Sequence, residues 1–247
     1  MNVSIASYSF HGLLGEGVID LFGYLESCRY RYQVRTADIW DGMLVSTEDG
    51  YLAKVKQALD ERELTLVNLC VDKADIWADD PHERERNYQN ALAHLRAAEV
   101  LGAKTIRINS AVKGVAFTNE QFDWVVKRFK EYAQRAYDHG FKAGPENHWG
   151  AENIPENMQR ICQAVDHPGF GMLLHFKGIK GDTIMAPWAM HTHISWDTTM
   201  NNLDESVTML RNAGYQGCWG VEHHSGKNEY ARVAVQLAML RNVLSAG

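Results

Sequence analysis

Short apolar runs alternate with amphipathic segments along the entire chain, and this alternation limits the possible folds more than any other feature. Short runs rich in β-branched residues are typical of buried strands, whereas apolar residues three and four apart are typical of helices. Strands are expected at residues 3–8, 34–40, 64–71, 103–109, 142–148, 169–176, 190–196 and 217–222. Helices are expected at residues 18–27, after residues 46–49, and at residues 82–101, 118–139, 155–165, 204–212 and 228–244. Residues 178–187 resemble a loop with a short helix.

Eight such units, with no linker between them, predict an α/β fold: a closed (β/α)8 TIM barrel formed by a single domain of residues 1–247. Two helix ends are clearly marked, because Thr118 and Gln121 form a capping box and Gly102 supplies a stop. An open doubly wound sheet is the alternative. It would be expected to carry a glycine-rich phosphate loop after its first strand, and residues 9–12 lack that pattern.

Composition and charge narrow the class of partner. Hydrophobic residues make up 45% of the chain, which is enough for a proper core. A net charge of -6 gives no long-range attraction to nucleic acid or to an anionic membrane. No stretch approaches the roughly 18 apolar residues of a membrane helix. The sequence therefore predicts a small-molecule partner, with neither nucleic acid nor membrane.

The cysteines and the N-terminus bear on location. Cys28, Cys70, Cys162 and Cys218 stand singly, which suits a reducing compartment and predicts buried thiols. The first residues lack the basic and apolar regions of a secretory signal. We expect a cytoplasmic protein.

Four metal-binding side chains end four consecutive expected strands. They are Glu146, His175, His193 and Glu222. In a barrel, the functional groups lie on the loops at the C-terminal ends of the strands, so these four should meet at one rim. Two carboxylates and two imidazoles suit Mn²⁺, Fe²⁺, Co²⁺, Zn²⁺ or Ni²⁺, whereas Mg²⁺ and Ca²⁺ prefer oxygen ligands. The sequence predicts a divalent metal ion, with Mn²⁺ as the first expectation.

Such an ion would act as a redox-neutral Lewis acid and would stabilise an enediolate formed when a neighbouring C–H is deprotonated. Glu146, Glu222 or His148 could be the base, since alternate residues of a strand share a face. His191 shares a face with His193, as a supporting or a substrate-contacting group. His223 is expected to be structural, and His224 to lie further out in its loop. Further candidates for substrate contact are Arg107, Asn109, Lys177 and Trp149.

At these motifs the chain resembles the xylose isomerase-like TIM-barrel superfamily, particularly its sugar phosphate isomerase/epimerase group. Residues 6–10 (Ala-Ser-Tyr-Ser-Phe), 145–148 (Pro-Glu-Asn-His), 191–194 (His-Thr-His-Ile) and 221–222 (Val-Glu) carry the resemblance. The family's metal ligands are Glu, Asp, His and Glu, which implies Glu146, His193 and Glu222 here. His175 stands where the family has Asp, and Gly178 stands where it has a substrate-contacting His.

The resemblance implies a metal-dependent carbohydrate enzyme. In the ketose 3-epimerases of this group, the two ligand glutamates move the proton on opposite faces of the carbon, a role open to Glu146 and Glu222. Inosose dehydratase and the catalytic subunit of C-glycoside deglycosidases are similar in fold, and the latter removes an aglycone by β-elimination. The resemblance further implies a homo-oligomer, or a hetero-oligomer with a small β-rich subunit in the deglycosidase case.

A sugar isomerase or epimerase is therefore the first prediction, and a lyase on a 3-oxo-glycoside or an inosose is the second. A DNA-repair endonuclease with the same barrel would be expected to have more metal ligands and a cationic surface. A barrel that binds sugar without catalysis, or serves as a scaffold, is the non-enzyme alternative. It would bind no metal tightly.

Overall fold

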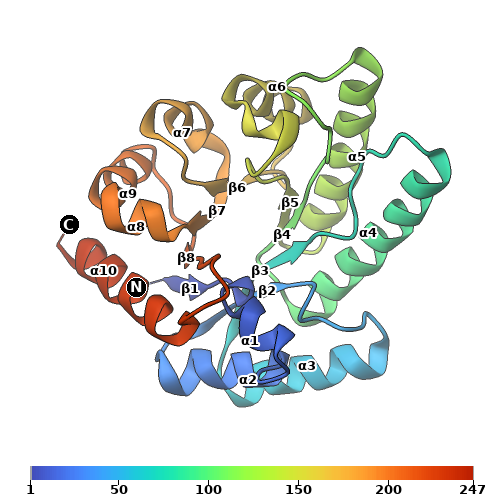
Figure 1. Cartoon of the computed structure of the whole chain (residues 1–247). Helices are drawn as coiled ribbons and strands as arrows, with labels where there is room; N and C mark the ends of the chain where they lie inside the picture. The colour runs from blue at the N-terminus through green and yellow to red at the C-terminus, as the bar shows by residue number, and fades with distance from the viewer. Residues whose placement is uncertain (1, 247) are drawn as a thin grey trace.

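The computed structural model describes residues 2–246, where eight parallel strands form a barrel surrounded by helices (Figure 1). The strands are β1 (Val3–Ile5), β2 (Thr36–Trp40), β3 (Thr65–Val71), β4 (Thr105–Ile108), β5 (Lys142–Gly144), β6 (Met172–His175), β7 (Ala189–Ile194) and β8 (Trp219–Val221). The longer helices are α2 (Leu21–Glu26), α3 (Asp49–Glu61), α4 (Pro81–Leu101), α5 (Asn119–Asp138), α6 (Pro155–Val165), α7 (Ile179–Met185), α8 (Trp196–Asn201), α9 (Leu203–Asn212) and α10 (Glu229–Ser245). The predicted α/β barrel is confirmed.

The barrel wall consists of two four-stranded ladders, β1-β8-β7-β6 and β2-β3-β4-β5. Single bridges join them. Ala6 pairs with Asp38 at the seam between β1 and β2, while Ala143 pairs with Phe170 and Glu146 with Leu173 at the seam between β5 and β6. Each seam therefore includes a buried carboxylate, Asp38 at the first and Glu146 at the second.

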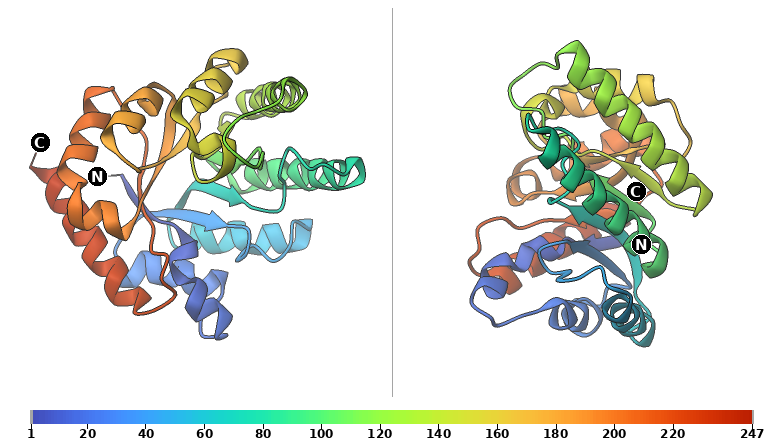
Figure 2. Two further views of the ribbon diagram at one scale, coloured as in Figure 1. Left: turned by 45° about the horizontal axis from the view of Figure 1, so that its top comes forward. Right: turned by 90° about the vertical axis from the view of Figure 1, so that its right-hand side faces the viewer.

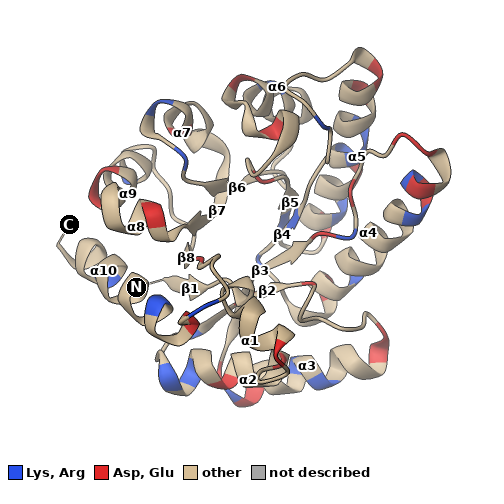
Figure 3. Cartoon of the chain, in the orientation of Figure 1, with Lys and Arg blue, Asp and Glu red and all other residues tan. Residues whose placement is uncertain are grey.

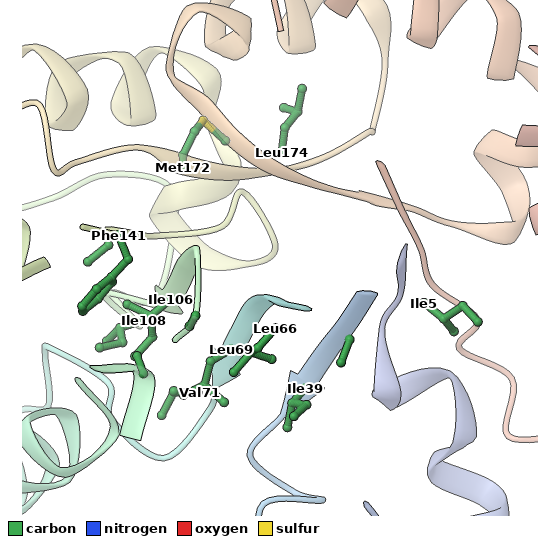
Figure 4. Packing of buried hydrophobic residues seen from close by; sticks show 14 of the residues in the cluster. Ile5, Ile39, Leu66, Leu69, Val71, Ile106, Ile108, Phe141, Met172 and Leu174 are labelled. Carbon is green, nitrogen blue, oxygen red and sulfur yellow. The ribbon is translucent and has the colours of Figure 1, made fainter. Parts of the chain in front are cut away.

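Side chains alternate between the two faces of the wall. Along β2, β3 and β4, residues such as Ile39, Leu69, Val71, Ile106 and Ile108 are buried in the main apolar core (Figure 4). Several of their neighbours in sequence, such as Asp38, Asn68 and Arg107, are polar and lie on the other face, toward the barrel interior. The apolar core therefore lies mainly between strands and helices. All four cysteines are buried, as predicted.

Several element ends differ from the sequence-based expectation because side-chain caps decide them. Asp20 accepts a hydrogen bond from the Gly23 N–H, so α2 begins at Leu21 and not at residue 18. Ser195 accepts from the Thr198 N–H and starts α8 at Trp196, a helix that the sequence analysis missed by extending strand seven. The capping box at Thr118 and the left-handed stop at Gly102 are confirmed.

Strand β5 ends four residues earlier than expected, at Gly144. Pro145 follows it and has no N–H to donate to a neighbouring strand. Its carbonyl accepts from the Leu173 N–H at 2.8 Å, and the next N–H, that of Glu146, donates to the side-chain Oδ1 of Asn109 at 3.1 Å. The chain at Glu146 is therefore held by a side chain in place of a regular ladder.

The last helix closes the ring beside the first strand, where α10 lies next to β1 (Figure 2). The buried carboxylate of Glu229 accepts hydrogen bonds from the Gly12 and Leu13 N–H groups at 2.8 and 2.9 Å. Acidic and basic residues alternate along outer helices such as α3 and α4 (Figure 3), as is typical of helices with a solvated face. None of the helices described has an apolar stretch long enough to span a membrane.

The close approach of the two backbones at the seam between β5 and β6 leads to a prediction about stability. A Cβ atom on Gly144 would lie 1.7 Å from the carbonyl oxygen of Gly171, so Gly144→Ala must push the two strands apart. We expect a loss in the free energy of unfolding of about 3 kcal/mol, at the upper end of overpacking effects, measured by urea denaturation. Gly50→Ala in α3 is the matched control, since its Cβ meets nothing within 4 Å and should be neutral or stabilising. Equal stability of the two variants would contradict the close approach.

Candidate metal centre

The ends of β5, β6, β7 and β8 bring Glu146, His175, His193 and Glu222 together. One ligand atom from each lies within 4.8 Å of the others, and all four residues are buried. These strand ends are neighbours in the ring (Figure 1). The structure thus gathers in one place the four residues that the sequence analysis proposed as ligands.

The distances within this group suit a single ion. Oε1 of Glu146 lies 3.1 Å from Nδ1 of His175 and 3.6 Å from Nδ1 of His193. Oε2 of Glu222 lies 3.4 Å from Nδ1 of His193 and 3.6 Å from Nδ1 of His175. Ligands bound at 2.0–2.2 Å in a tetrahedral site are separated by about 3.4 Å. The donor set and its spacing fit a transition-metal ion.

Two of these ligand atoms are buried without a hydrogen-bond partner in the part of the chain that the structure describes. Within residues 2–246, Nδ1 of His193 and Oε2 of Glu222 are buried and make no hydrogen bond, although Nε2 of His224 lies 2.9 Å from that oxygen. A buried polar atom without a partner costs about 1–3 kcal/mol. A cation placed between the nitrogen and the oxygen would satisfy both atoms at once.

The pKa values of the group reflect the same crowding of charge. Burial raises the pKa of Glu146, but hydrogen bonds from His148 and His175 outweigh it and hold that pKa well below its usual range. Burial lowers the pKa of His193, but the carboxylates of Glu222 and Asp38 raise it well above its usual range. The raised pKa of His193 favours its positively charged form beside these carboxylates.

Asp38 is a part of the site that the sequence analysis missed. Its Oδ2 accepts from Nε2 of His191 at 2.7 Å and from Nε2 of His193 at 3.1 Å. These three residues are close enough to be a second ion-binding group. However, His193 is shared with the first group and the spacings are those of hydrogen bonds, so we assign Asp38 and His191 to the support of His193.

A cavity of about 220 Å³ is lined by three of the four ligands, Glu146, His193 and Glu222, whereas His175 lies outside its lining. This is smaller than the roughly 300–1,000 Å³ of pockets for drug-sized ligands, and it suits a molecule the size of a monosaccharide. Residues expected from the sequence to be functional line it: Arg107, Glu146, His148, Trp149, His193 and Glu222. Other residues complete the lining: Ala6, Tyr8, Asp38, Trp40, Cys70, Asp72 and His224.

Arg107 lines one side of this cavity, and its guanidinium is paired with two carboxylates. Nε of Arg107 lies 3.2 Å from Oε2 of Glu146, and its Nη1 lies 2.6 Å from Oδ1 of Asp72. Trp40 Nε1–H donates to the other oxygen of Asp72 at 2.6 Å. Two carboxylates therefore balance the charge of Arg107, which leaves it suited to hydroxyl groups more than to an anion.

Two imidazoles, His148 after β5 and His224 after β8, lie beside the ligand carboxylates. Nδ1 of His148 lies 3.2 Å from Oε1 of Glu146, and its ring is edge-on to Trp149. His224 lies beside Glu222 and lines the cavity, closer to the centre than the sequence analysis expected. The sequence held a signal for this position, because His224 follows Glu222 by two residues and so shares its face. His223 binds Ser225 and the Lys227 carbonyl, in keeping with a structural role.

Three residues expected to contact substrate lie outside the cavity lining. Asn109 accepts from the Glu146 N–H, Lys177 donates from Nζ to the carbonyl oxygen of His148, and His191 is buried against Asp38. Each is bonded to a residue that lines the cavity. In this structure they support the site, which for His191 is one of the two roles the sequence left open.

Comparison with known proteins agrees with this architecture. The sequence profile described as "Xylose isomerase-like TIM barrel" matches residues 34–243. The chain belongs to this family. A search of curated protein sequences gives no significant match.

Solved structures of similar fold include proteins named as enzymes. The D-psicose 3-epimerase of Clostridium cellulolyticum H10, solved with D-tagatose, is 14% identical with a TM-score of 0.79 over 99% of both chains. A xylose isomerase-like barrel protein from Mycobacterium smegmatis, solved with magnesium, is 15% identical with a TM-score of 0.76 over 99% of this chain and 97% of that one. The probable 3-DHS dehydratase AsbF of Bacillus anthracis is 16% identical with a TM-score of 0.74 over 98% of this chain and 99% of that one. At these identities, the likeness is one of fold.

The geometry of the four ligands predicts the metal content of the protein. We expect about one divalent transition-metal ion per chain by elemental analysis after incubation with Mn²⁺ or Zn²⁺ and desalting. The Glu146→Gln/Glu222→Gln variant should bind roughly 100-fold more weakly or worse, because even supporting residues of metal sites are worth 10–100-fold. Glu152→Gln is the matched control, a buried carboxylate that accepts from the Ser110 N–H. Equal metal content in all three proteins would contradict the site.

Proposed function

We propose that this protein is a divalent-metal-dependent isomerase or epimerase of a small unphosphorylated keto-sugar, acting through an enediolate. The observation that carries the proposal is the group of four buried ligand atoms, two of them without hydrogen bonds in the described part of the chain, beside a cavity of about 220 Å³ that three of the four residues line. Mn²⁺ is the ion we propose, although the donor set also suits Fe²⁺, Co²⁺, Ni²⁺ and Zn²⁺.

The bound ion would supply Lewis-acid stabilisation of negative charge on the substrate oxygens. The chain supplies the proton transfers. We assign the base to one of the carboxylates, Glu146 or Glu222, which takes the proton from the carbon beside the carbonyl and later releases it to water. The other carboxylate takes a proton from water and returns it to carbon, so both carboxylates end the cycle ionised as they began it. His148 and His224 reach the same cavity and are placed to hydrogen-bond the substrate oxygens as charge develops on them. Atoms and charge balance, and the product has the mass of the substrate.

The substrate class follows from charge and shape. Arg107 is already paired with Glu146 and Asp72, and Lys177 is not among the residues that line the cavity, so, among the described residues, the cavity offers a phosphate no unpaired Lys or Arg side chain. Tyr8, Trp40 and Trp149 line the cavity and provide aromatic surface for the apolar side of a sugar ring. A neutral polyhydroxylated ketone satisfies these features.

A lyase reaction on a keto-sugar or 3-oxo-glycoside is the second candidate, and His148 is the observation that favours it. Elimination needs a base at one carbon and a proton donor for the leaving oxygen. The imidazole of His148, 3.2 Å from Glu146, provides a titratable group in addition to the two ligand carboxylates. The similarity in fold to a probable dehydratase is consistent with this alternative.

Product mass in deuterated water separates the two reactions. We expect the Mn²⁺-loaded protein, incubated with a panel of unphosphorylated ketoses in D₂O, to yield an isomer that carries one carbon-bound solvent deuterium. Phosphorylated counterparts should turn over at least tenfold more slowly. Glu222→Gln should lower kcat by about 10²–10⁴-fold, the usual contribution of a general base, whereas Glu120→Gln on the exposed start of α5 should leave kcat unchanged.

Other outcomes of this experiment would contradict the proposal in distinct ways. A product lighter by one water, or a released aglycone when 3-oxo-glycosides are included, would establish the lyase. Binding of sugars to a protein that holds no metal and gives no turnover would establish the sugar-binding barrel.

A further inference from the structure

We propose that Asp38 is the positioning residue of the metal centre: its carboxylate fixes His193 with Nδ1 toward the ion and supplies a third negative charge behind the ligand shell. This inference rests on the proposed metal-dependent function, and it concerns a residue that lies on β2, across the barrel from the ligand strands. Asp38 has no place among the four ligands, yet it is one of the most buried charged groups of the chain, with 1% of its surface exposed.

The position of Asp38 is fixed by neighbours on every side. Its backbone bridges Ala6 at the seam between β1 and β2, and its N–H donates to the hydroxyl of Tyr24 at 2.8 Å. In its side chain, Oδ1 accepts from Nδ2 of Asn68 at 2.9 Å, and Oδ2 accepts from the two histidines of β7. Asn68 is tied in turn to Thr105 on β4 at 2.8 Å. The carboxylate has three donors and little freedom to move.

This arrangement selects one tautomer of His193. An ionised carboxylate accepts hydrogen bonds and cannot donate them, so Nε2 of His193 carries the hydrogen. In the neutral ring, the lone pair is then on Nδ1. That atom makes no hydrogen bond within the described part of the chain and faces Oε2 of Glu222 at 3.4 Å and Oε1 of Glu146 at 3.6 Å. Asp38 thereby presents the nitrogen that an ion needs.

The charge of Asp38 also matters to the centre. The four ligands include only two carboxylates, and one of these, Glu146, lies 3.2 Å from the guanidinium of Arg107. A divalent ion would therefore meet less negative charge than two carboxylates supply alone. Asp38 adds a negative charge one imidazole away from the ion, in a buried region where screening by water is weak.

The test is the affinity of the protein for metal alone. Asp38→Asn keeps the shape but offers an N–H where His193 needs an acceptor, or an oxygen without charge. We expect its dissociation constant for Zn²⁺, measured by competition with a chromophoric chelator, to be 10–100-fold higher than that of the wild-type protein. Asp41→Asn is the matched control. Asp41 is a buried carboxylate that accepts from the backbone N–H groups of Asp72 and Lys73, and its loss should change the constant less than twofold.

A second measurement needs no variant and holds if Asp38→Asn does not fold. In ¹⁵N-labelled wild-type protein loaded with Zn²⁺, long-range ¹H–¹⁵N spectra should show His193 with a coordinated Nδ1 and a protonated Nε2. Coordination through Nε2, or unchanged Zn²⁺ affinity in a folded Asp38→Asn variant, would overturn the inference while leaving the metal centre in place. Failure of the wild-type protein to bind Zn²⁺ or Mn²⁺ would overturn the metal centre and this inference together.

Discussion

Two carboxylates and two imidazoles share one buried space at the rim of the barrel, and they are stable there only if positive charge lies among them. Burying an ionised carboxylate without a partner is costly, so each must be paired. Arg107 and His148 pair with Glu146, while Glu222 faces the rings of His193 and His224. The unpaired atoms of His193 and Glu222 mark where the pairing is incomplete. A divalent ion, if bound there as proposed, would complete it.

Irregular strand pairing at the two seams of the barrel positions Glu146 and Asp38. At one seam, Pro145 ends the regular ladder of β5 and lets Glu146 bridge Leu173 with its N–H on Asn109. At the other, the register of β2 and β3 shifts between Ala37 and Asp38, next to the bridge from Asp38 to Ala6. Irregular pairing is common beside active sites because it re-aims side chains. Here one seam carries the ligand Glu146, and the other carries Asp38, which supports the ligand His193.

Much of this could be predicted from the sequence, because the signals were local. The eightfold alternation of apolar and amphipathic segments predicted the barrel. The positions of Glu146, His175, His193 and Glu222 at the ends of four consecutive expected strands predicted that they form one group. Asp38 gave no such signal, since it lies within a strand and its partners are 153 and 155 residues away. Asp72 gave no local signal either, because its place in the cavity lining depends on its contacts with Arg107 and Trp40. The early end of β5 and the start of α8 depend on individual hydrogen bonds that the apolar pattern does not record. Whether Asn109, Lys177 and His191 touch substrate remains a prediction that their positions outside the cavity lining do not favour.

The central claim is that these four side chains bind one ion, and X-ray absorption at the Zn edge of the Zn²⁺-loaded protein tests it most directly. The account predicts a nearest shell of nitrogen and oxygen at about 2.0–2.2 Å, with the outer scattering of two imidazole rings. A shell that contains sulfur, which would implicate Cys70 at the cavity wall, or a shell without imidazole scattering would contradict the assignment.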